Sequence, residues 1–108
     1  MPLPDITHLQ FLLLSTLRAA EMSGRELREE LSKEGERKTA PAFYQLMARM
    51  EEQGFVEGWY IEKVVEGQRI RERHYKLEGL GERALTDACR FYQGRAEGLV
   101  LEGVMAGG

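Results

Sequence analysis

The hydrophobic pattern of this chain changes period twice, and the order of those changes constrains the fold more than any other feature. Apolar residues recur at helical spacing up to about residue 53. Residues 55–77 are rich in β-branched and aromatic side chains, and residues 79–108 return to helical spacing. This order predicts three helices, a two-stranded β-hairpin and a final helix, in a protein that is mainly α with a small β-hairpin.

Side chains that suit helix N-caps precede each of the first three helical stretches. Thr7–Gln10 and Ser23–Glu26 each match a capping box, in which the first and fourth side chains satisfy each other's free amides. Thr39 offers a third N-cap, and Gly54 is well placed to end the helix that follows. We expect helices over 7–20, over 24–33 and between Thr39 and Gly54.

Glycines mark the turn of the hairpin and weaken the last helix. Gly67, within Glu66–Gln68, supplies the positive φ that a tight turn needs. Gly94 and Gly98 lower the stability of the distal half of the final helix by roughly 1 kcal/mol each relative to Ala. We therefore expect the tail from Met105 to fray.

The order helix, helix, helix, hairpin, helix is typical of a winged helix-turn-helix domain. In such domains the third helix enters the major groove of DNA and the hairpin forms the wing. The length of 108 residues suits one domain with one hydrophobic core. We expect residues 1–78 to form the winged DNA-binding domain and residues 79–108 to form a C-terminal dimerisation helix.

The charge distribution supports two interpretations. The net charge of −3 argues against binding to nucleic acid. Within Gln68–Lys76, however, four basic residues accompany one acidic residue, Glu72, which gives a local net charge of +3. Such a strip is either an electrostatic footprint for nucleic acid or a solvated hairpin edge whose charges prevent strand aggregation.

Several segments share a family pattern. In residues 43–56 an aromatic Tyr is followed by a Leu two residues on, then a basic residue, an apolar residue, Glu, and Gly with two apolar residues. This resembles the recognition-helix signature of PadR-type transcriptional regulators, and residues 71–77 resemble the family's basic wing. The resemblance covers about residues 9–85. Further family positions are matched by Gly24, Leu27, Gly81, Ala84 and Leu85.

The resemblance implies a homodimeric transcriptional regulator, a repressor that binds an inverted-repeat operator in double-stranded DNA. It also implies relief of repression by a small-molecule effector or another signal, of which the sequence identifies none. Trp59 and Tyr60 suit either an effector pocket or the core. The alternative is a winged-helix module that contacts other proteins without binding DNA.

The candidate DNA contacts lie on the third helix and the hairpin. Tyr44 is expected to face the groove because Phe43, about 100° away around the helix, suits the core; partial burial is the alternative. Gln45 can bond adenine and Arg49 guanine, although Arg49 could equally pair with a surface glutamate. Thr39 is explained as well by a plain helix cap. The predicted DNA contacts are Lys38, Thr39, Tyr44, Gln45, Arg49, Lys63, Arg69, Arg71 and Arg73.

A dimer is predicted from unpartnered apolar residues. The first helix is apolar over a wide arc that includes Phe11 and Leu14, and the last helix carries an apolar stripe. A small monomer can hardly bury both. The predicted dimer contacts are Leu9, Leu13, Leu80, Leu85, Ala88, Tyr92 and Leu99.

Catalytic and metal-binding chemistry finds little support. The single cysteine, Cys89, permits no internal disulfide, and we expect it on a buried helix face. His8 and His74 lie far apart without a cysteine pair, so we expect no metal site, no cofactor and no enzyme.

The longest apolar run, Phe11–Leu14, is far shorter than the ~20 residues of a membrane span. It also lacks the basic segment that precedes a signal sequence, so we expect a cytoplasmic protein.

Overall fold

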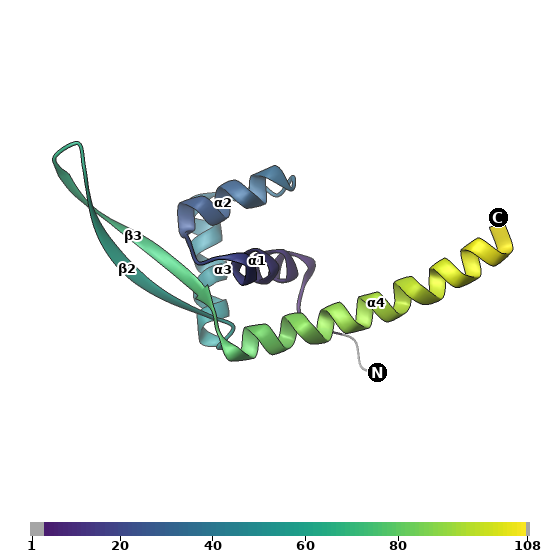
Figure 1. The fold of residues 1–108 in the computed structure, drawn as a ribbon. Coiled ribbons are helices and arrows are strands. Elements are labelled where there is room, and N and C mark those ends of the chain that lie inside the picture. The colour runs from purple at the N-terminus through teal and green to yellow at the C-terminus, as the bar shows by residue number, and fades with distance from the viewer. Residues whose placement is uncertain (1–3, 108) are drawn as a thin grey trace.

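The computed structural model describes the backbone of residues 4–107 and the side chains of residues 4–100. Three short helices lie between two long projections, the β2–β3 hairpin on one side and α4 on the other (Figure 1). The molecule is 64 Å long and 26 Å by 22 Å across. The predicted winged-helix class is confirmed. The elements are α1 (His8–Ala19), β1 (Met22–Ser23), α2 (Gly24–Lys33), α3 (Ala40–Glu52), β2 (Val56–Val65), β3 (Gln68–Leu77) and α4 (Gly79–Gly107).

Local capping starts each of the first three helices, as predicted. The Gln10 amide donates to the Thr7 hydroxyl over 3.1 Å, and the Thr7 amide donates to the Gln10 side chain over 3.0 Å. Ser23 and Glu26 form the same reciprocal pair at the start of α2. The Thr39 hydroxyl caps α3 by accepting a hydrogen bond from an amide of its first turn. These bonds satisfy amides that have no partner inside a helix.

The wing is a regular antiparallel hairpin. Its register runs from Val56 opposite Leu77 to Val65 opposite Gln68. The two-residue turn has φ values of 51° at Glu66 and 80° at Gly67. Two positive φ values define the turn type whose twist matches that of paired strands, which explains why a glycine stands here.

A third strand joins the hairpin, which the sequence did not predict. Met22 pairs with Tyr75 and Ser23 with His74, so the sheet has the order β1-β3-β2. This short strand comes immediately before α2. It therefore ties the start of the helix-turn-helix to the base of the wing.

The core fills the space between the short helices, the base of the wing and the first turns of α4. Phe43 is fully buried, as predicted. The buried cluster comprises Leu13, Leu14, Leu17, Leu27, Leu31, Phe43, Met47, Met50, Val56, Tyr75 and Leu85.

Three of the predicted dimer contacts are wrong because their side chains are buried within a single chain. Leu13, Leu85 and Ala88 are at most 1% exposed within a single chain. Their apolar character is therefore explained by the chain's own core, and they present no surface to a second copy. The next residue along α4, Cys89, is exposed, so the prediction that it lies on a buried face is also wrong.

α4 is a continuous helix of 29 residues. Gly94 and Gly98 do not interrupt it, and it runs through Gly107, past the point at Met105 where we expected fraying. The last residue, Gly108, lies outside the described residues. In the part of the chain that the structure describes, no helix is long and apolar enough to cross a membrane.

Gly81 allows α4 to approach the connection between α3 and β2. A Cβ on Gly81 would overlap the backbone oxygen of Phe55, which cannot rotate away, and would lie 2.9 Å from a methyl group of Leu77. We expect Gly81→Ala to lower the free energy of unfolding by roughly 1–3 kcal/mol, measured by urea denaturation at a fixed protein concentration. Gly79→Ala is the matched control, because its added Cβ would meet nothing within 4 Å. Equal stability of the two variants would contradict this account.

Candidate nucleic-acid interface

α3 presents a polar outer face beside its buried one. Gln45 and Arg49 are exposed and lie one turn apart, while Phe43 and Met47 point into the core. Tyr44 is 37% exposed. The helical period thus separates core residues from residues on the outer face of α3. The burial predicted for Phe43 is confirmed, and the groove contact predicted for Tyr44 stays a prediction.

The start of α3 is held by α2. Arg28 of α2 donates to the backbone carbonyl of Lys38 over 3.1 Å. Thr39, the next residue, is the exposed N-cap of α3. Free amides at a helix N-terminus favour anions, so this end of α3 is electrostatically suited to a phosphate.

One face of the wing carries the arginines. Arg69, Arg71 and Arg73 alternate along β3, and Tyr60 of β2 lies directly opposite Arg73. Arg69 and Arg71 are exposed. This face turns toward α3, because Arg73 reaches Glu51 on that helix.

Arg73 is committed to an ion pair, which corrects its prediction as a free phosphate contact. Its guanidinium donates to the Glu51 carboxylate over 2.5 Å, and both side chains are 24% exposed. Burial lowers the pKa of Arg73, but the hydrogen bond and the charge of Glu51 outweigh it and raise the pKa above its usual value. Arg73 therefore joins the wing to α3.

Lys63 lies on the opposite face of the wing, away from the arginines. Its ammonium group is 2.8 Å from the Glu72 carboxylate, which also lies 3.5 Å from Arg25 and 3.3 Å from His74. The hydrogen bond from Lys63 holds the pKa of Glu72 below its usual value despite partial burial. The prediction that Lys63 extends the basic face is wrong, because strand alternation turns it to the other side.

A cleft of about 570 Å³ separates the outer face of α3 from the arginine face of the wing. Burial raises the pKa of Tyr75, at the base of the cleft, to about 12, so its phenol is neutral at physiological pH. Two opposite charges, Arg73 and Glu51, are paired here, which leaves Arg71 as the net positive charge. The cleft is lined by Tyr44, Ala48, Glu51, Tyr60, Arg71, Arg73 and Tyr75.

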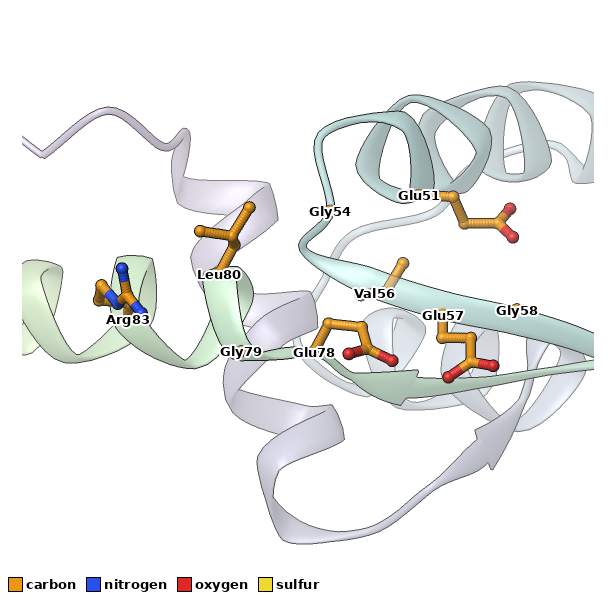
Figure 2. Close-up of a pocket in the computed structure, with 9 residues that line it drawn as sticks. All are labelled: Glu51, Gly54, Val56, Glu57, Gly58, Glu78, Gly79, Leu80 and Arg83. Atoms are coloured by element: carbon orange, nitrogen blue, oxygen red, sulfur yellow. The ribbon is translucent and has the colours of Figure 1, made fainter.

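A second hollow, of about 630 Å³, is acidic. It lies where α3 ends and α4 begins, and Figure 2 shows carboxylates of Glu51, Glu57 and Glu78 around it. Hydrogen bonding with Glu78 and with Lys76, whose ammonium group lies 3.2 Å from the Glu57 carboxylate, lowers the pKa of Glu57. Arg83 is the one basic residue in the lining of the hollow, against three glutamates. Its charge disfavours a nucleic-acid phosphate. Among residues 4–100 no cluster of metal-ligating side chains was found.

Solved structures share this arrangement. No family model matches the chain, and no curated protein does. A PadR family transcription regulator from Clostridium difficile matches with a TM-score of 0.72 at 18% identity, over 86% of this chain and 95% of that one. Bacillus subtilis PadR in complex with operator DNA matches with a TM-score of 0.61 at 19% identity, over 75% of this chain and 46% of that one.

The fold is a PadR-like winged helix. A putative transcriptional regulator from Thermoplasma acidophilum also matches, with a TM-score of 0.60 at 26% identity, over 91% of this chain and 92% of that one. The C-terminal helix of the PadR-like fold is present here as α4.

In this PadR-like fold, the Tyr44 ring occupies the space left by Gly24, which has no side chain, at the start of α2. Its ring packs edge-on against Phe43, with centroids 5.1 Å apart. A Cβ on Gly24 would lie 2.5 Å from the Tyr44 hydroxyl oxygen. Gly24 therefore makes room for the phenol at the start of α2.

This contact predicts that the effect of Gly24→Ala depends on Tyr44. In the natural chain the added methyl must displace the ring. In a Tyr44→Ala background that clash is gone, and we expect Gly24→Ala to stabilise the chain by up to about 1 kcal/mol through helix propensity. Urea denaturation of the four proteins measures the coupling. The same change in stability in both backgrounds would show that Tyr44 does not rest on Gly24.

Proposed function

We propose that this protein is a DNA-binding transcriptional regulator that acts as a homodimer in the cytoplasm and represses a neighbouring operon. The observation that carries the proposal is the exposed face of α3, with Gln45 and Arg49, beside a wing face with two exposed arginines. The chain also shares its fold with a PadR that was solved with operator DNA.

In the proposed complex, α3 lies in the major groove. Gln45 bonds an adenine edge and Arg49 a guanine edge, which gives sequence specificity. Arg69 and Arg71 bind phosphates, as do Thr39 and the amides at the start of α3, and these contacts supply most of the affinity. The alternative is a module that contacts only proteins, and it is an outcome of the DNA-binding test.

The proposed dimer uses apolar surface on α4 and α1 that the chain leaves open. Leu80, Tyr92 and Leu99 are 52%, 44% and 65% exposed. Tyr92 packs edge-on against Phe11 of α1, with ring centroids 6.4 Å apart, so this surface continues across both helices beside the half-buried Leu9. An obligate interface here would bury above ~2,000 Å² in total.

Leu99→Glu tests the dimer. We expect this variant to be folded but monomeric at micromolar concentration, because the charge would enter an apolar interface. Light scattering coupled to size-exclusion chromatography measures the mass. Val64→Glu is the matched control, since Val64 is 70% exposed on the distant wing. Leu85→Glu should instead unfold the chain. A dimeric Leu99→Glu protein, or a monomeric natural protein, would refute the proposed interface.

Selection from randomised DNA duplexes tests the function. We expect enrichment of an inverted repeat with half-sites about 10 bp apart, the spacing of one helical turn. Gln45→Ala or Arg49→Ala should reduce discrimination at one base pair by about 1–3 kcal/mol. Arg69→Ala should weaken binding to selected and scrambled duplexes alike. It should also make the plot of log affinity against log salt shallower by roughly one unit. Failure to enrich any sequence would favour the protein-contact alternative.

A further inference from the structure

Tyr60 is a large aromatic side chain placed in the open on the wing. It is 56% exposed, and two guanidinium groups approach its ring. The Arg71 guanidinium carbon lies 4.2 Å from the ring centroid and that of Arg73 lies 4.7 Å from it. Both distances are within the range of a cation–π interaction.

The two arginines differ in what else holds them. Arg73 is the register partner of Tyr60 and is fixed from its other side by Glu51 of α3. Arg71 is exposed, and its cross-strand partner, Glu62, forms no ion pair with it. Within the described residues, no carboxylate lies within 4.0 Å of the Arg71 guanidinium. The Tyr60 ring is thus the contact that places this charge.

These contacts form a chain from the recognition helix to a free cation. Glu51 of α3 fixes Arg73, Arg73 and Tyr60 stack on the wing, and Tyr60 in turn supports Arg71 at the cleft between α3 and the wing. An arginine that is already placed loses less conformational freedom when it binds a ligand than an unrestrained one.

We propose that Tyr60 is a positioning residue that holds Arg71 at this cleft to bind one phosphate of the DNA backbone. This inference rests on the proposed DNA-binding function and goes beyond it in one respect. It assigns the placement of the phosphate-binding arginine to an aromatic residue that is not itself a DNA contact.

The test is a double-mutant cycle measured by fluorescence anisotropy, on a selected duplex and on a scrambled duplex, at several salt concentrations. Tyr60→Ile keeps the strand preference but removes the ring, and we expect affinity to fall about two- to fivefold. The salt slope should stay the same, because Arg71 retains its charge. Tyr60→Phe keeps the ring and should bind as the natural protein does.

Coupling identifies the partner of Tyr60. In an Arg71→Ala background, which itself lowers the salt slope by roughly one unit, Tyr60→Ile should have no further effect. In an Arg69→Ala background it should keep its full effect. Arg69 is the matched control because it lies on the same face but opposite Val64, farther along the wing.

A measurement without DNA checks the same contact. In the free protein, the NMR signals of the Arg71 side chain should be shifted by the ring current of Tyr60 and should move toward random-coil values in Tyr60→Ile. Thermal denaturation confirms that each variant folds. Tyr60→Thr, another strand-favouring change, replaces Tyr60→Ile if that variant is unfolded.

Several results would overturn the inference. An equal loss of affinity in Tyr60→Phe would mean that the hydroxyl group contacts DNA directly. Additive effects of Tyr60→Ile and Arg71→Ala would mean that the ring acts through Arg73 or another group. Binding that is unchanged in Arg71→Ala would remove the phosphate contact while leaving the proposed function intact. Absence of DNA binding by the natural protein would instead refute the proposed function.

Discussion

The ion pair between Glu51 and Arg73 is the interaction on which the geometry of the candidate interface depends. The hairpin has ten paired residues on each strand, but its buried residues, such as Val56 and Tyr75, lie at its base. Toward the tip, residues 62–71 are all exposed. The pair joins α3 to β3 at the point where the wing leaves the core, in a partly buried setting where charges attract more strongly than in water. The angle between α3 and the wing is therefore set by electrostatics as well as by packing.

The sequence predicts those features that depend on neighbouring residues. The capping boxes, the Thr39 cap and the glycine turn are local interactions, and each is present where the pattern placed it. Contacts between residues far apart in the sequence could not be predicted. The strand Met22–Ser23 is too short to show alternation and pairs with residues about fifty positions away. Amphipathic spacing also cannot tell a chain's own core from a dimer surface, and for that reason Leu85 was misassigned.

The segregation of charge explains how a chain with a net charge of −3 could offer a surface to DNA. Electrostatic interactions between exposed charges are screened over about 8 Å at physiological salt, so the local field matters more than the total. The acidic hollow, with Glu57 and Glu78, lies at the junction of α3 and α4 (Figure 2). Arg69 and Arg71 lie along the wing instead. Glu51 borders both regions, and its pairing with Arg73 keeps its charge from opposing an approaching phosphate.

The hydrophobic core connects α4, which carries the proposed dimer surface, to α3, which carries the proposed DNA surface. The proximal half of α4 contributes Leu85 to the same buried cluster that contains Phe43 and Met47 of α3. An exposed ion pair, with Arg18 of α1 3.3 Å from Glu82, adds a second connection of α4 to the helical body. Farther out, α4 leaves that body, as Figure 1 shows. A close-packed core resists small displacements, so a change in how two α4 helices meet would move each α3 as part of a rigid unit. In the proposed dimer, the spacing of the two recognition helices would therefore follow from the packing of α4, while the match to each half-site would follow from α3 and the wing.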